Sequence, residues 1–331
     1  MKILVTGAAG FIGSAMSRAL LAAGHEVVGV DNLNAYYDPA LKQARLDWIG
    51  DADGFTFERM DFSDSSAVEK LGADHRFDVI VHLGAQAGVR YSLEDPHAYA
   101  QSNLVGQLNL LELARAQQPR HFLYASSSSV YGGNQKLPFS VGDRVDRPVS
   151  FYAATKRSGE LMAESYAHLY RLPMSGLRFF TVYGPWGRPD MAMWLFTEAL
   201  YKGETIRLFN QGEMRRDFTY IDDIVAGMMG LIDKPPADDG SEKPGGSIAP
   251  HAIFNIGNNR PEELGHLLAT LEAATGRKAI TELAPMQAGD VEATYADIEA
   301  LSALTGFQPT TTIETGAKAF VDWYAAYHDI N

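Results

Sequence analysis

The sequence has 331 residues, of which 46% are hydrophobic, and a formal net charge of −13. No basic stripe is present, which argues against nucleic-acid binding and means that an anionic substrate needs locally placed cations. Because there are no cysteines, disulfides and cysteine-ligated metals are excluded, and the nine histidines show no metal-ligand spacing. No signal peptide or membrane-length apolar run is present, so we expect a cytoplasmic protein that does not bind a membrane.

The chain begins with a predicted strand, a glycine-rich turn and a helix. Lys2–Thr6 is a short apolar run, and Gly7, Gly10 and Gly13 follow it before helical periodicity begins. Glycines in this setting let backbone N–H groups approach a pyrophosphate. The second predicted strand ends in Asp31, whose carboxylate can bind the adenosine ribose and disfavours a 2′-phosphate. The pattern therefore predicts NAD, in preference to NADP, as the cofactor.

Strands and helices continue to alternate over the first half. Strands are predicted near 56–60, at 78–84 and at 121–126, with helices near 65–72 and over 96–117. The alternation predicts an α/β fold, namely a Rossmann-type, doubly wound parallel sheet with ligands beyond the carboxyl ends of its strands. Candidate cofactor contacts in the first turn and at these ends are Phe11, Ile12, Asn32, Asp61, Phe62, Leu83, Ala85 and Gln86. The sequence leaves open whether Asp61 binds adenine or only begins a helix.

Tyr152 and Lys156 are four residues apart, so on a helix they lie on one face, one turn apart. A cation at that distance favours the phenolate and lowers the pKa of a phenol, ordinarily about 10. The pair is therefore a candidate general acid/base. The serine run at 126–129 follows the fifth predicted strand, where its hydroxyls could face a nicotinamide and a sugar; a polar turn is the alternative. No G-x-S-x-G motif is present, which argues against a hydrolase.

Together these motifs resemble the extended short-chain dehydrogenase/reductase superfamily. Within its NAD-dependent epimerase/dehydratase family, four stretches resemble the UDP-glucuronate 4-epimerases: 33–38, 84–92, 178–191 and 214–223. The resemblance covers essentially the whole chain. It implies an NAD-binding domain at 1–180, with return segments at about 216–233 and 252–258. A smaller C-terminal α/β domain at 181–215 and 259–331 would then bind the UDP-sugar.

The resemblance also implies a mechanism, in which a UDP-uronate is transiently oxidised at C4 by NAD and hydride returns to the opposite face. Tyr152 would be the base, Ser127 would bind the 4-oxygen, and Lys156 would hold the nicotinamide ribose. Asn103 resembles the family residue that supports this network, with a helix-interior polar residue as an equal alternative. Thr181 and Arg188 would meet the carboxylate, unless Arg188 is only a solvated loop residue. Other implied contacts are Ser128, Phe180, Arg90 (phosphate or carboxylate), Phe209 (uracil), Arg216 (diphosphate) and Asp290 (ribose or diphosphate).

Several alternatives remain open at this stage. A UDP-glucuronate decarboxylase is close, because a 4-keto uronate can lose CO2; related dehydratases and decarboxylases carry acidic residues where this chain has Ser128 and Ser129, which favours epimerisation. A 4-epimerase of neutral UDP-hexoses is a second alternative, although Gln287 stands where many UDP-galactose 4-epimerases have arginine. An alcohol dehydrogenase would have to exchange its cofactor freely with the solution. A sensor that only binds NAD or a nucleotide sugar would not need a tyrosine with a tuned pKa, so Tyr152 and Lys156 argue against it.

Arg216 could instead form an ion pair with Asp217 at a strand edge. The family commonly forms homodimers through two helices, here 96–117 and 152–170, whose apolar faces could equally be internal core.

Overall fold

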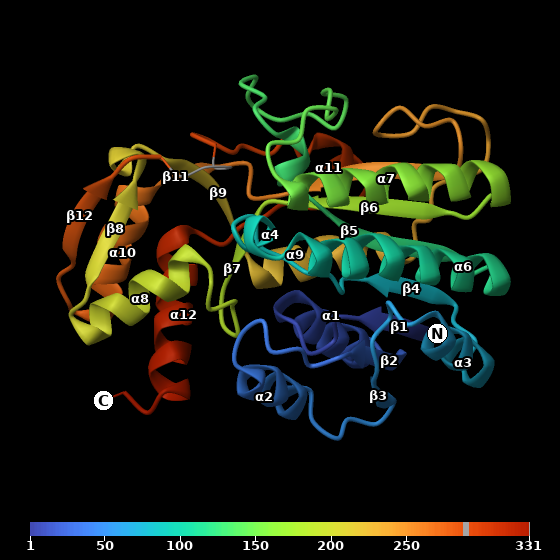
Figure 1. Cartoon of the computed structure of the whole chain (residues 1–331), viewed down its shortest axis with the longest axis horizontal. Helices are drawn as coiled ribbons and strands as arrows, with labels where there is room; N and C mark the ends of the chain where they lie inside the picture. Colours follow the sequence, from blue (N-terminus) through green and yellow to red (C-terminus); the bar gives the residue numbers. More distant parts are fainter. Residues whose placement is uncertain (287–290, 331) are drawn as a thin grey trace.

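The computed structural model describes residues 1–286 and 291–330. Its centre is a seven-stranded sheet in the order β10-β6-β5-β4-β1-β2-β3 (Figure 1). All neighbouring strands of this sheet are parallel. The strands are β1 Lys2–Thr6, β2 Glu26–Asp31, β3 Phe55–Arg59, β4 Val79–His82, β5 His121–Ser127, β6 Met174–Phe179 and β10 His251–Ile256. The predicted doubly wound α/β fold is therefore confirmed.

Two apolar layers cover the two faces of this sheet, as expected when parallel strands are buried on both sides. One layer includes Met16, Leu20, Ile224 and Met228 from α1 and α9, and the other includes Leu110 and Ala163 from α6 and α7. The helices of the first layer are α1 Phe11–Ala22, α9 Ile221–Ile232 and α11 Glu299–Thr305, and α2 Pro39–Ile49 packs beside α1. Those of the second are α3 Ser65–Asp74, α6 Gln107–Gln117 and α7 Phe151–Tyr170.

The helix predicted over 96–117 is interrupted by a π-helical segment. It consists of α5 Pro96–Tyr99, the π-helix η1 Ala100–Gly106 and α6, and it follows the short helix α4 Tyr91–Glu94. π-helical turns inside α-helices occur frequently at functional sites. Here the segment carries Asn103, one of the predicted site residues.

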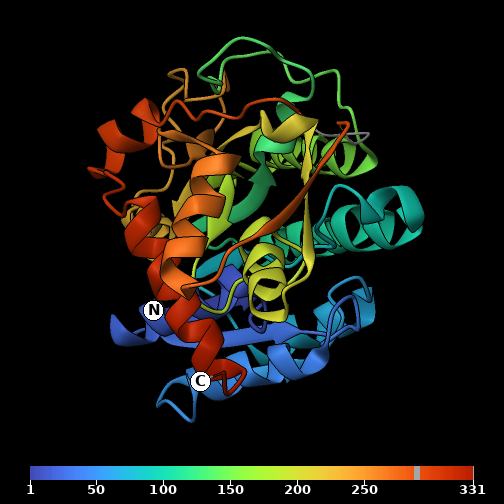
Figure 2. The same cartoon turned by 90° about the vertical axis from the view of Figure 1, so that its left-hand side faces the viewer.

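The C-terminal elements pack around a separate apolar cluster beyond the carboxyl ends of the central strands (Figure 2). Its helices are α8 Ala192–Lys202, α10 Leu264–Thr275 and α12 Ile313–Tyr327, and its two-stranded parallel sheet pairs β8 Thr205–Phe209 with β12 Ile280–Ala284. A three-stranded sheet, β11-β9-β7, connects the two parts. Its strands are β7 Thr181–Tyr183, β9 Arg215–Tyr220 and β11 Pro261–Glu263, and the short 3₁₀ turns are η2 Ser128–Tyr131 and η3 Asn210–Gly212.

The sequence analysis did not predict α2, although it lies beside the cofactor-binding turn. Its buried positions include Lys42 and Arg45 as well as Leu41 and Ile49, so the buried face lacks a clear apolar period. None of the helices in the described parts of the chain is both long and apolar enough to cross a membrane.

Candidate active site

A cavity of about 770 Å³ lies at the carboxyl ends of the central strands. Its walls come from the β1–α1 turn, the segments after β4 and β5, the start of α7, and the loops around β7, β8 and β9. Most of the residues predicted for cofactor and substrate line it. They are Gly7, Gly10, Phe11, Ile12, Gly13, Asp31, Asn32, Phe62, Leu83, Ala85, Gln86, Arg90, Ser127, Ser128, Tyr152, Lys156, Phe180, Thr181, Arg188, Phe209 and Arg216.

The β1–α1 turn has the close backbone packing that the glycine pattern predicts. Gly7 adopts a φ of 70°, and its N–H donates to Val30 O at 2.8 Å. A Cβ at Gly13 would lie only 1.9 Å from Gly7 O, so only glycine lets α1 begin this close to the turn. Asp31 lies at the end of β2 and accepts a hydrogen bond from Leu33 N at 2.9 Å. These features fit a dinucleotide whose pyrophosphate meets the helix start and whose ribose meets Asp31.

Asp61 and Asn103 do not line the cavity but support residues that do. The Asp61 carboxylate accepts from Asn32 Nδ2 at 2.9 Å and from Ser63 N at 2.8 Å. Asp61 therefore stabilises a local turn and also fixes Asn32, which faces the cavity.

The Asn103 side chain connects the segment after β4 to the helix that carries Tyr152. Its Oδ1 accepts from Gln86 N at 2.8 Å, and its Nδ2 donates to Gln86 O at 3.0 Å and to Thr155 Oγ1 at 3.1 Å. These three bonds favour the supporting role over that of an ordinary helix-interior polar residue.

The start of α7 brings the predicted acid/base group to the serine run. Ser150 caps the helix by accepting a hydrogen bond from Ala153 N at 3.1 Å, which puts Tyr152 in the first turn. Lys156 Nζ donates to Ala125 O at 3.0 Å and lies 5.9 Å from the centroid of the Tyr152 ring. The Ser127 Oγ, at the end of β5, donates to Ser129 Oγ at 3.1 Å.

The groups around Tyr152 act on its pKa in opposite directions. Burial raises the pKa of Tyr152, whereas a hydrogen bond with Ser127 and the charge of Arg188 act to lower it, and the charge of Asp190 acts to raise it. Burial and, secondarily, Arg188 lower the pKa of Lys156 to about 8. Ser127 and Arg188 therefore favour the phenolate, and the role of Lys156 toward Tyr152 stays a prediction.

Arg188 lies in the cavity and is held by a carboxylate of its own loop. Its Nε donates to Asp190 Oδ1 at 3.0 Å and its Nη2 to Asp190 Oδ2 at 2.5 Å, while Tyr36 OH donates to Asp190 Oδ2 at 3.1 Å. Burial, the largest single influence, acts to raise the pKa of Asp190, but the charge of Arg188 and the hydrogen bonds from Arg188 and Tyr36 together outweigh it, so the pKa is lowered. The contacts exclude a freely solvated loop arginine. Sequence reasoning missed Asp190 and Tyr36, although the Arg-Pro-Asp spacing was visible.

The remaining predicted substrate contacts include Arg90, Phe209 and Arg216, which also line the cavity. The Arg90 guanidinium lies 5.3 Å from the centroid of the Phe209 ring. Arg216 Nη1 donates to Glu292 O at 3.2 Å. The neighbouring Asp217 is fully buried, and its carboxylate accepts from the backbone N–H groups of three residues: Asn258, Asn259 and Ala296. Asp217 therefore anchors two segments behind Arg216. Asp290 and Gln287 lie outside the described residues.

Comparison with known proteins identifies the family. A sequence model of the NAD dependent epimerase/dehydratase family matches residues 3–257. The chain belongs to this family. The predicted resemblance and the NAD cofactor are thereby confirmed.

Several relatives of this epimerase/dehydratase chain share nearly its full length. The probable UDP-glucuronate 4-epimerase of Rhizobium meliloti is 48% identical over 330 residues, covering 98% of this chain and 97% of that one. UDP-glucuronate 4-epimerase 1 of Arabidopsis thaliana is 46% identical, covering 100% of this chain and 78% of that one. The crystal structure of the Bacillus cereus UDP-glucuronic acid 4-epimerase, in complex with UDP-glucuronic acid and NAD, superposes with a TM-score of 0.89 at 33% identity. It covers 99% of this chain and 100% of that one.

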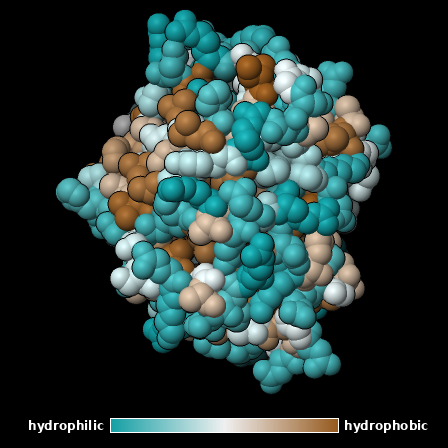
Figure 3. All heavy atoms as spheres, turned by 90° about the vertical axis from the view of Figure 1, so that its right-hand side faces the viewer, coloured by the Kyte–Doolittle hydropathy of each residue, from teal (hydrophilic) through white to brown (hydrophobic). Residues whose placement is uncertain are grey.

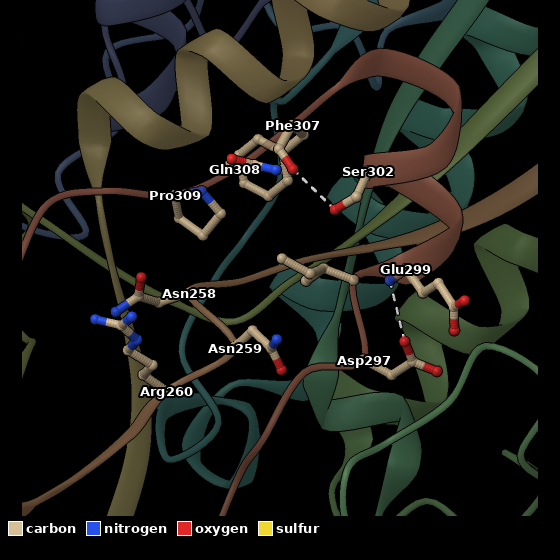
Figure 4. Close-up of a pocket in the computed structure, with 10 residues that line it drawn as sticks. Asn258, Asn259, Arg260, Asp297, Glu299, Ser302, Phe307, Gln308 and Pro309 are labelled. Atoms are coloured by element: carbon tan, nitrogen blue, oxygen red, sulfur yellow. Dashed lines mark hydrogen bonds between the residues drawn. The ribbon is translucent and has the colours of Figure 1, made fainter.

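A second hollow, of about 490 Å³, opens beside α11 and the β10–β11 connection (Figure 4). Its side chains bind mainly to their own loops: Ser302 Oγ donates to Phe307 O at 2.8 Å, and Asp297 Oδ1 accepts from Glu299 N at 3.0 Å. Of the predicted site residues that the structure describes, none lines this hollow. The larger cavity is therefore the candidate active site of this family member. Across the described ranges there is no cluster of three or more His, Cys, Asp or Glu suited to a metal ion.

Proposed function

We propose that the protein interconverts UDP-glucuronate and UDP-galacturonate by reversible oxidation at C4 of the sugar. The observation that carries this proposal is the closeness of Tyr152 and Arg188. Both line one cavity, and the charge of Arg188 favours the Tyr152 phenolate. A sugar whose 4-OH faces Tyr152 can therefore bring the carboxylate on the neighbouring C5 to Arg188. The named relatives and the Bacillus cereus complex, which bind or act on UDP-glucuronic acid, support the same substrate.

The β1–α1 turn and Asp31 would hold NAD, with Lys156 near the nicotinamide ribose. When bound, NAD accepts a hydride from C4 of the sugar and returns it, and its positively charged ring adds to the charges that favour a phenolate at Tyr152. The chain itself would bind, orient and exchange protons. Tyr152 would remove the proton from the 4-OH as a general base and give it back as a general acid. Ser127, which hydrogen-bonds Tyr152, would bind the 4-oxygen and keep the phenol aligned with it.

The possible acid/base groups of the cavity favour epimerisation over decarboxylation. Ser128 and Ser129 occupy the positions where related lyases carry carboxylates, and serine hydroxyls are poor bases at neutral pH. Asp190 is a carboxylate within the cavity wall, but Arg188 and Tyr36 bind it and its pKa is lowered. A carboxylate with a lowered pKa that already accepts several hydrogen bonds is a weak base. Arg188 would hold the substrate carboxylate through N–H groups that Asp190 does not occupy.

Proton NMR of UDP-glucuronate incubated with the purified protein tests the proposal. We expect UDP-galacturonate as the sole product, without net NADH release. A UDP-pentose product would favour the decarboxylase, and accumulation of NADH would favour a dehydrogenase. Turnover of UDP-glucose but not of UDP-glucuronate would favour a neutral-sugar epimerase. Binding of NAD and UDP-glucuronate without turnover would favour a sensor.

We further propose two domains with the predicted boundaries and a cytoplasmic homodimer formed through α6 and α7. Leu108 on α6 and Leu161 and Leu169 on α7 support the dimer, because these large apolar side chains remain exposed along the two helices. Seen from the right-hand end of the molecule, where α6 and α7 end, hydrophobic residues lie mainly toward one side of the face, among hydrophilic ones (Figure 3). Sedimentation of Leu161→Glu beside the wild type tests the dimer, which the charged variant should dissociate.

A further inference from the structure

Arg45 on α2 is fully buried, yet it belongs to no part of the site described so far. Its guanidinium makes five hydrogen bonds. Nε and Nη2 donate to Trp186 O at 3.0 and 2.7 Å, and Nη2 also donates to Gly187 O at 3.0 Å. Nη1 donates to Ala9 O at 3.2 Å and to Tyr37 OH at 2.6 Å. Because a guanidinium has five N–H groups, every donor of Arg45 has an acceptor.

These acceptors belong to two functional segments that are far apart in the sequence. Ala9 is part of the β1–α1 turn, which is predicted to bind the pyrophosphate. Trp186 and Gly187 belong to the loop that carries Arg188 into the cavity. Arg45 therefore joins the cofactor-binding turn directly to the loop that is proposed to recognise the uronate.

The loop before Arg188 has a backbone that needs such support. Trp186 adopts a φ of 66°, in the left-handed region that a non-glycine residue rarely enters, and Gly187 N donates to Gly184 O at 3.0 Å to close a tight turn. Arg45 donates hydrogen bonds to the carbonyl oxygens of both Trp186 and Gly187. It thereby fixes the peptide units immediately before Arg188.

Aromatic packing holds the same turn from the side. The Trp186 ring lies 5.5 Å from the Trp48 ring of α2 and 5.2 Å from the Trp323 ring of α12, measured between centroids. Helix α2 thus contacts Trp186 twice, through Arg45 on its carbonyl group and through Trp48 on its ring. This arrangement leaves the turn little freedom to move relative to the cofactor-binding turn.

We propose that Arg45 is the positioning residue that fixes the Arg188 loop on the cofactor-binding turn and so determines the preference for a uronate over a neutral sugar. The inference rests on the proposed function, because it assumes that Arg188 binds the substrate carboxylate. Arg45 acts only through the Arg188 loop. Recognition of a carboxylate by a planar fork depends on orientation, and a displaced Arg188 loses that contact while the contacts to the uridine diphosphate remain.

The test uses Arg45→Lys, which keeps the charge but offers three donors without a planar fork. Titration calorimetry of the NAD-loaded protein would measure the dissociation constants of UDP-glucuronate and UDP-glucose. We expect Arg45→Lys to weaken UDP-glucuronate binding by about tenfold, as for the loss of a charged hydrogen bond, and UDP-glucose binding by less than about twofold. Arg76→Lys is the matched control, since Arg76 is exposed, does not line the cavity and also donates to a backbone carbonyl oxygen, that of Gln117.

A double-mutant cycle with Arg188→Ala separates positioning from a general structural role. If Arg45 acts through Arg188, adding Arg45→Lys to Arg188→Ala causes no further loss of preference. Equal weakening of both sugars by Arg45→Lys, or losses that add in the double variant, would overturn the inference while leaving the proposed function intact. A wild type that forms no UDP-galacturonate, or binds both sugars equally, would overturn both. Should Arg45→Lys fail to fold, Trp48→Leu replaces it: a smaller selective loss supports the inference, and an unchanged preference overturns it.

Discussion

Glu160 and Arg178 form a buried bidentate ion pair beneath the candidate active site. Arg178 Nε donates to Glu160 Oε1 at 2.8 Å and Nη2 donates to Oε2 at 3.0 Å, with the two side chains 2% and 1% exposed. Ser126 Oγ donates to the same carboxylate at 2.6 Å. Because Glu160 lies one turn beyond Lys156 on α7, and Ser126 immediately precedes Ser127 on β5, the Glu160 carboxylate joins the two elements that carry the proposed chemistry, while Arg178 ties it to β6.

We therefore expect Glu160→Gln to lower the free energy of unfolding by about 3–5 kcal/mol, because it leaves a buried guanidinium without its countercharge. Urea denaturation followed by circular dichroism measures the change. Glu112→Gln is the control, since Glu112 pairs with Arg115 on an exposed surface and such pairs contribute little. Equal stability of the two variants would contradict the structural importance of the buried pair.

Tyr152→Phe removes only the hydroxyl that is proposed to exchange the 4-OH proton. We expect turnover of UDP-glucuronate to fall by at least about a hundredfold, the usual range for loss of a general acid/base. The thermal unfolding midpoint and the dissociation constant of UDP-glucuronate should change little, because the ring keeps its packing. NMR turnover rates, with calorimetry and thermal unfolding as controls, measure these quantities. A rate close to that of the wild type would refute the role of Tyr152.

Much of the fold could be predicted because its core strands follow simple rules. The strands β1, β2 and β5 are short apolar runs with a glycine directly after the first and aspartate and serine at the ends of the others, and the parallel arrangement places those ends at one edge. The residues that gather there, including Gly7, Asp31 and Ser127, could thus be assigned to one site from the sequence. The motif spacing of Tyr152 and Lys156 added the helix start that faces them.

The missed features depend on contacts between distant segments. Helix α2 was missed because Arg45, a buried position, is charged, and its acceptors at Ala9 and Trp186 are 36 and 141 residues away. Tyr36 and Asp190 are 154 residues apart in the sequence, so nothing in the sequence indicated that one would bind the other.

Arg188→Ala tests whether the loop recognises a carboxylate. We expect the dissociation constant of UDP-glucuronate to rise by about tenfold or more, since a charged hydrogen bond is lost, while that of UDP-glucose changes far less. Arg144→Ala is the matched control, because Arg144 and Asp146 repeat the Arg-x-Asp spacing on the exposed surface. Equal losses for the two sugars would count against carboxylate recognition by Arg188.

Removing either charge of the Arg188–Asp190 pair should shift the pKa of Tyr152, and the two shifts should have opposite signs. The charge of Asp190 acts to raise the pKa of Tyr152, and the charge of Arg188 acts to lower it. Asp190→Asn removes the negative charge, so the Tyr152 phenolate should form at lower pH than in the wild type. Arg188→Gln removes the positive charge, so the phenolate should form at higher pH. Further titratable groups near Tyr152 in the described part of the chain include Lys156 and Tyr99, which both variants retain.

Ultraviolet titration of phenolate absorbance measures these shifts directly when each variant is compared with its own Tyr152→Phe double variant. Turnover should follow the same order, because the phenolate is the proposed base. The rise of the rate with pH should therefore move to lower pH in Asp190→Asn and to higher pH in Arg188→Gln. Asp146→Asn, in the exposed Arg-x-Asp pair, should leave both curves unchanged. Shifts of the same sign in the two active-site variants would contradict the electrostatic argument, because opposite charges cannot change one pKa in the same direction by that mechanism.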